Sequence, residues 1–137
     1  MPIKKMHNFI NNQSYPNIGL LVLRLGMAGM MFFGHGLGKL WNFTQASGKF
    51  PDPLGIGSEL SLSAAVFGEF FCSIALILGF MTRYASIPFV STMLVAAFIQ
   101  HGADPFAEKE KALLYLVGGV VLFFCGPGKF SVDAKMN

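Results

Sequence analysis

The chain has 137 residues, of which 53% are hydrophobic and only 12% are charged, and its formal net charge at pH 7 is +3. Soluble domains carry about 25% charged residues, and a protein of this size exposes too much of its surface to bury so many apolar side chains. The high apolar content also excludes a disordered chain, and the scattered Lys and Arg residues form no basic stripe for nucleic acid, so we expect an integral membrane protein.

We predict an all-α fold, an integral membrane bundle of four transmembrane helices. A helix needs about twenty mostly apolar residues to cross the hydrocarbon core of a bilayer. The predicted parts, in chain order, are a polar N-terminal tail (1–16), a transmembrane domain (17–128) with helices over about 17–41, 58–80, 84–102 and 105–125, and a polar C-terminal tail (129–137).

The first and second predicted helices each carry one charge inside an apolar stretch, Arg24 and Glu69 respectively. The third helix has the clearest pattern, since Tyr84 to Ala103 contains no Asp, Glu, Lys or Arg. In the fourth helix the uncharged part is short, and we expect the apolar stems of Lys109 and Lys111 to extend it by snorkelling.

A second interpretation of the N-terminal region is a cleaved signal peptide over residues 1–34. Arg24 lies inside the apolar core that such a peptide requires, and no small-residue cleavage site follows it. The membrane helix is therefore the preferred interpretation.

The two charges within membrane helices are the most informative residues of the sequence. Inserting a charge costs at least about 2.5 kcal/mol, so Arg24 and Glu69 are expected to face the bundle interior and to find partners. Counted from the helix ends, their depths differ by about 6–9 Å, which an Arg side chain can largely bridge. We predict an Arg24–Glu69 ion pair, which serves either to fix helix register or as a polar site for a ligand or a proton.

Further polar residues of the predicted helices are expected to lie together toward the outer side of the membrane. Arg24, His35 and Lys39 share one face of the first helix, and the glycines around His35 let a neighbouring helix or a ligand approach closely. Gln100 and His101 end the third helix, and Glu108 and Lys111 lie at the start of the fourth. Together with Glu69, these residues are the candidate lining of a ligand pocket, and the alternative is that the histidines and Lys39 are interfacial residues in the headgroup zone. Their spacing is too loose for a metal site, and we predict none.

Short motifs follow one another in a fixed order along residues 17–133. They are Leu23-Arg24-Leu25, His35-Gly36 followed by Lys39, Gly68-Glu69, Leu78-Gly79-Phe80 with Thr82-Arg83, Glu110-Lys111-Ala112-Leu113-Leu114-Tyr115-Leu116, and Gly126-Pro127-Gly128 with Ser131 and Asp133. In order and spacing they resemble the DoxX family. The resemblance implies a small four-helix protein of the bacterial inner membrane. The family name is linked to the DoxD and DoxA subunits of an archaeal thiosulfate:quinone oxidoreductase, and some relatives are implicated in membrane complexes that handle thiol or oxidative stress.

Three functions fit the sequence together with this resemblance. The first is a membrane subunit that binds a lipophilic ligand such as a quinone in a pocket, with Arg24, His35, Lys39, Glu69 and His101 as candidate ligand-binding residues. The second is a non-catalytic scaffold for a membrane-associated redox or stress-response complex, and the third is a small proton-coupled transporter. No residue pattern supplies a redox centre, so we expect no catalytic activity from the chain alone, and any activity only within a quinone-linked oxidoreductase complex.

Four crossings place both chain termini on one side of the membrane. That side carries five Lys and Arg residues against four on the other, so the positive-inside rule favours cytoplasmic termini. The expected partners are the lipid bilayer and a membrane or peripheral protein, a homo-oligomer is left open, and nucleic acid is not expected.

Overall fold

The structure is a computed structural model that describes residues 2–12 and 14–136. These residues form helices and no strands, which confirms the all-α prediction. Among the described residues, three helical stretches are long and apolar enough to cross a membrane, within Ile3–Trp41, Ser58–Leu78 and Thr82–Gln100. The predicted tails include residues 1, 13 and 137, which lie outside the described residues.

The first three long helices are built from α-helical segments and π-helical turns, whose backbone hydrogen bonds span five residues instead of four. The first long helix consists of α2 (Ser14–Leu23), η1 (Arg24–Ala28), α3 (Gly29–Met31), η2 (Phe32–Gly36) and α4 (Leu37–Trp41). The second consists of α6 (Ser58–Val66), η3 (Phe67–Phe71) and α7 (Cys72–Leu78), and the third of α8 (Thr82–Val95) and η4 (Ala96–Gln100). The remaining helices are α9 (Phe106–Cys125) and the short α1 (Ile3–Ile10), α5 (Phe43–Ala46) and α10 (Val132–Met136).

Helix α9 corresponds to the fourth predicted transmembrane helix. It has 20 residues, but Glu108, Lys109, Glu110 and Lys111 occupy its beginning. Because of these four charged residues, the apolar part of α9 is too short for α9 to count with the three stretches above. A fourth crossing and a four-helix membrane bundle therefore stay predictions.

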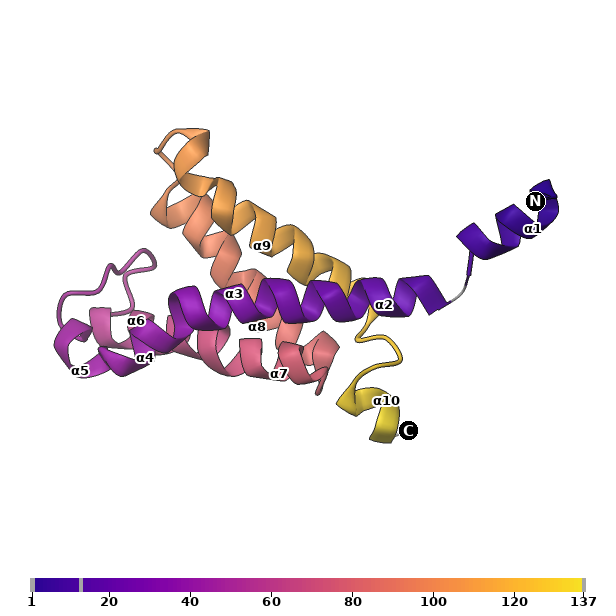
Figure 1. The fold of residues 1–137 in the computed structure, drawn as a ribbon. Helices are drawn as coiled ribbons and strands as arrows, with labels where there is room; N and C mark the ends of the chain where they lie inside the picture. Colours follow the sequence, from indigo (N-terminus) through magenta and orange to yellow (C-terminus); the bar gives the residue numbers. More distant parts are fainter. Residues whose placement is uncertain (1, 13, 137) are drawn as a thin grey trace.

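All four long helices contribute to one core. Met31, Leu76, Phe89 and Leu122, one from each long helix, are at most 1% exposed. Figure 1 shows α9 beside α8, and the run from α2 to α4 lying along α6 and α7. Many large apolar side chains point outward instead, among them Phe33 at 73% exposure, and a lipid environment is the solvent that suits such a surface.

Two motif glycines set the distances between helices. A Cβ atom at Gly36 would collide with the backbone carbonyl of Glu69, and one at Gly68 would collide with the hydroxyl of Thr92. The first long helix therefore touches the backbone of the second at Gly36, and the second approaches α8 at Gly68. Small residues allow this kind of close helix packing in membranes.

Gly36→Ala is expected to lower the free energy of unfolding by about 1–3 kcal/mol, because the added methyl group forces two backbones apart. Gly34→Ala is the matched control, since it lies in the same π-helical turn and a Cβ atom there meets nothing within 4 Å. Thermal unfolding of both variants in one detergent measures the difference. Equal midpoints for the two variants would show that the contact at Gly36 does not limit packing.

Candidate functional site

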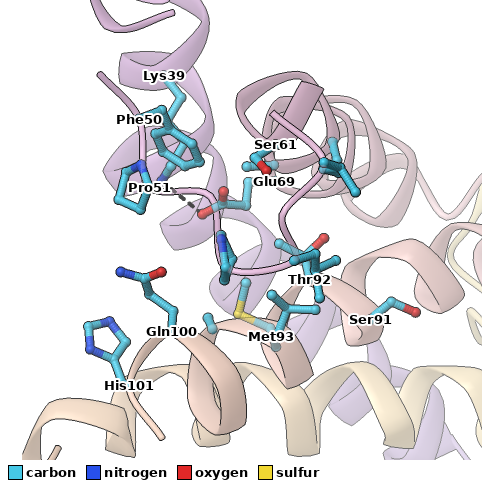
Figure 2. Close-up of a pocket in the computed structure, with 17 residues that line it drawn as sticks. Lys39, Phe50, Pro51, Ser61, Glu69, Ser91, Thr92, Met93, Gln100 and His101 are labelled. Atoms are coloured by element: carbon cyan, nitrogen blue, oxygen red, sulfur yellow. Dashed lines mark hydrogen bonds and ion pairs between the residues drawn. The ribbon is translucent and has the colours of Figure 1, made fainter. Parts of the chain in front are cut away.

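A cavity of about 520 Å³ opens between the loop after α5 and the walls formed by α6, η3, α8 and η4. Most of its lining is apolar. Figure 2 shows the labelled side chains around it, including Phe50 and Pro51 from the loop and Met93 from α8. The volume lies within the range of about 300–1,000 Å³ that is usual for sites that bind small organic molecules.

An ion pair provides the main polar feature of this cavity. Lys39 Nζ in α4 donates a hydrogen bond to Glu69 Oε1 in η3 at 3.0 Å, drawn as a dashed line in Figure 2. Glu69 is only 6% exposed. The close approach at Gly36, one helical turn before Lys39, brings the two helices near enough for this contact. The glycine and the ion pair are thus parts of one arrangement.

The predicted Arg24–Glu69 ion pair is wrong. Glu69 pairs with Lys39, while Arg24 reaches the carbonyl groups of Leu76 and Ile77, seven and eight residues farther along the second long helix, or about 11–12 Å. Arg24 as a whole is 1% exposed. It donates at 2.8–2.9 Å to the backbone carbonyl oxygens of Leu76, Ile77, Pro127 and Phe130.

Two of the carbonyl groups that bind Arg24 are available because they lie at the end of a helix. The last four carbonyl groups of any α-helix lack partners within that helix and carry partial negative charge. Leu76 and Ile77 belong to this group in α7. Residues 127–130 supply two more carbonyl oxygens, so one planar guanidinium joins the first long helix, the end of the second and the segment after α9.

Asp133 stabilises the start of α8, close to the contacts of Arg24. Its carboxylate accepts hydrogen bonds from the backbone N–H groups of Met81 and Thr82 at 2.8 and 3.0 Å, and so caps the start of α8. Partial burial would raise the pKa of Asp133, but these N–H groups, together with the charge of Arg24, lower it below its ordinary value. The Asp133 N–H also donates to the carbonyl of Gly79.

The cavity brings together three of the five predicted site residues. Lys39, Glu69 and His101 line it, and Arg24 and His35 do not. His101 also places Nδ1 2.8 Å from a carboxylate oxygen of Asp104. The ring of His35 packs edge-on against Tyr115 of α9, with 5.9 Å between ring centres.

Sequence reasoning missed the loop as part of the site. Phe50, Pro51, Pro53, Leu54 and Ile56 all line the cavity. The available signal was the apolar character of this proline-rich segment, since most loops are polar. Gln100 in η4, which precedes His101 at the end of the third long helix, also lines the cavity.

The four π-helical turns coincide with polar residues of the long helices. Arg24 lies in η1, His35 in η2, Glu69 in η3 and Gln100 in η4. Such turns are frequent at functional sites in proteins. Two of the four, η3 and η4, contribute a polar side chain to the cavity.

Asp52 fastens the loop over the cavity. Its carboxylate accepts hydrogen bonds from the hydroxyl of Ser61 and from the backbone N–H groups of Gly57 and Ile56, at 2.8–2.9 Å. The Ser61 bond first, and then the bonds from the backbone, hold the pKa of Asp52 below its ordinary value. Ser61 lies on α6, so the loop is tied to the wall that it covers.

Comparison with known proteins places these features in a family. A family model described as DoxX matches residues 19–102. The inner membrane protein YqjF of Escherichia coli (strain K12) is 27% identical over 127 residues, covering 88% of this chain and 94% of that protein. The uncharacterized membrane protein Rv3486 of Mycobacterium tuberculosis (strain ATCC 25618 / H37Rv) is 26% identical over 141 residues, covering 86% of this chain and 81% of that protein. No solved structure matches significantly.

Arg24→Lys is expected to lower the free energy of unfolding by roughly 2 kcal/mol or more, because lysine keeps the charge but cannot reach four carbonyl oxygens on two segments. Arg83→Lys is the control with the same chemical change. Arg83 also donates to carbonyl oxygens, those of Phe123 and Phe124, but it is exposed. Chemical unfolding in detergent compares the two, and a loss as large in Arg83→Lys would contradict the special role of Arg24.

Asp52→Asn is expected to loosen the loop at neutral pH, because an amide replaces two acceptor oxygens with one. The folded-state pKa of Asp52 lies below its ordinary value of 3.8. The wild-type advantage is therefore present above about pH 4 and is lost as pH falls through the lowered pKa. Thermal unfolding of both proteins between neutral and acidic pH should show midpoints that converge at low pH. Glu59→Gln, which removes an exposed carboxylate of α6, should show no such convergence.

Proposed function

The chain belongs to the DoxX family, and on that basis we propose that it is an inner-membrane protein that binds a lipophilic ligand, with a quinone as the leading ligand. The observation that carries the proposal is the cavity itself: mostly apolar walls with a small group of polar side chains. The family match and the name of the Escherichia coli relative support the inner membrane as its location.

The lining fits a quinone in its chemistry. The ring and the first part of the isoprenoid tail need apolar contacts, which Phe50, Leu54 and Met93 provide. The carbonyl oxygens of the ring need hydrogen-bond donors. Lys39 retains two N–H groups beyond the one that Glu69 accepts, and the amide of Gln100 is a further donor.

Each residue group has a distinct role in this proposal. A bound quinone would supply the capacity to accept or donate electrons. The chain would position the ring between Lys39 and Gln100, exclude water with the loop that Asp52 fastens, and keep the Lys39 charge balanced through Glu69. No catalytic step is assigned to the chain alone.

We extend the proposal to the arrangement in the membrane, with α9 as the fourth crossing. Lys109 Nζ donates to the carbonyl of Gly102 in the turn before α9, so the charged start of α9 can lie at the membrane boundary with its lysine stems in the apolar region. Cytoplasmic termini, the proposed orientation, would then place the cavity in the outer half of the membrane.

A scaffold role is the second candidate function. The observation that favours it is the set of hydrogen bonds around Arg24. The motif residues Gly79, Pro127 and Asp133 meet there, where they stabilise the fold and do not line the cavity. The described residues add no observation in favour of a proton-coupled transporter.

Ala96→Phe is expected to reduce binding of a short-tailed ubiquinone at least tenfold, because the ring fills part of the cavity that Ala96 lines. Gln100→Leu should weaken binding by roughly 5–10-fold through loss of one hydrogen bond. Native mass spectrometry of the protein titrated in mild detergent measures both effects.

Val117→Phe is the control for the size of the substitution, since Val117 is 58% exposed on α9 and lies outside the cavity. Unchanged quinone binding in Ala96→Phe, with normal thermal stability, would refute the cavity as the quinone site. A stoichiometric protein partner retained by wild type and Ala96→Phe alike, without quinone, would support the scaffold.

A further inference from the structure

Helix α1 has one apolar face that the rest of the described chain leaves largely exposed. Ile3, Met6, Phe9 and Ile10 are 44–81% exposed, and α1 contains no buried residue. At 100° per residue these four side chains fall within an arc of about 120°. This is a smaller version of the apolar stripe by which amphipathic helices bind surfaces.

The other face of α1 is basic and polar. It carries Lys4, Lys5 and Asn8, and no Asp or Glu occurs in the sequence before Asp52. The region around α1 therefore has positive charge without any acidic residue of its own to neutralise it. Anionic lipid headgroups are a partner with the complementary charge.

Helix α1 also lies just before the first long helix in the chain. The ring of Phe9 packs edge-on against Tyr15 at the start of α2, with 6.5 Å between ring centres. Tyrosine is typical of the membrane–water interface. Farther along α2, the apolar side chains of Ile18 and Val22 are also exposed.

We propose that α1 lies flat in the headgroup region of the membrane, with its apolar face toward the acyl chains and its lysines bound to negatively charged lipids. An eight-residue helix has little apolar area for binding alone. Its attachment to the first long helix makes docking intramolecular, which raises the effective concentration of the lipid surface. This inference does not depend on what the cavity binds.

The experiment uses the full chain with Cys72→Ala and Cys125→Ser and one new cysteine for an environment-sensitive fluorophore. Phe9→Cys labels the apolar face, and Asn8→Cys is the matched control on the polar face. The proteins are reconstituted in vesicles of phosphatidylcholine, with or without phosphatidylglycerol, and quenching by a spin label on the lipid chains is measured. Because α1 lies outside the core, both labelled proteins should unfold at the same temperature.

Quenching is expected to be several-fold stronger at position 9 than at position 8 and to increase with phosphatidylglycerol. Lys4→Gln and Lys5→Gln should each reduce the docked-to-undocked ratio in the anionic vesicles about fivefold and have little effect in neutral ones. Equal quenching at both positions in both lipids would overturn the proposal. A label at position 9 that is shielded from water without lipid quenching would also overturn it, by showing a protein surface there.

Discussion

The burial of Arg24 is the constraint on which the rest of the structure depends. Arg24 is 1% exposed, so its guanidinium needs protein acceptors for its N–H groups, and no single helix offers enough of them. Four carbonyl oxygens from the end of α7 and from residues 127–130 meet this need. The position of the second long helix and the course of the chain after α9 are therefore fixed by one side chain of the first long helix.

The two ends of the molecule divide the family motifs between them. At the end that holds Arg24, the motif residues mostly satisfy backbone groups: the carbonyls of α7 through Arg24, and the first amides of α8 through Asp133. At the opposite end, Gly36 and Gly68 bring helices together around Lys39 and Glu69, beside an open cavity. One set of motif residues thus builds the scaffold, and the other set borders a space that a ligand can occupy.

Composition and apolar run lengths were enough to predict the helical fold and three of the apolar helices. They also singled out Arg24 and Glu69, because charges are rare in such helices. The partners could not be predicted from residue counts. The comparison of depths assumed that the two charges meet at a similar level in the membrane, whereas Arg24 bonds to backbone carbonyl groups at the end of α7. Backbone acceptors are present at every residue, so residue types do not identify which of them a side chain will reach. The loop over the cavity was missed for a related reason, since its position depends on the contact from Asp52 to Ser61 across nine residues.

The Arg24 contacts also set an order of events during synthesis. Phe130, which supplies one of the carbonyl oxygens, follows Arg24 by 106 residues. At ribosomal rates of about 5–20 residues per second, the first long helix would wait roughly 5–20 s for that partner to be made. During this interval the arginine must rely on water, lipid headgroups or the insertion machinery. The closure of these contacts is therefore a late, post-insertion event, even though the residue that organises them is made long before its last partner.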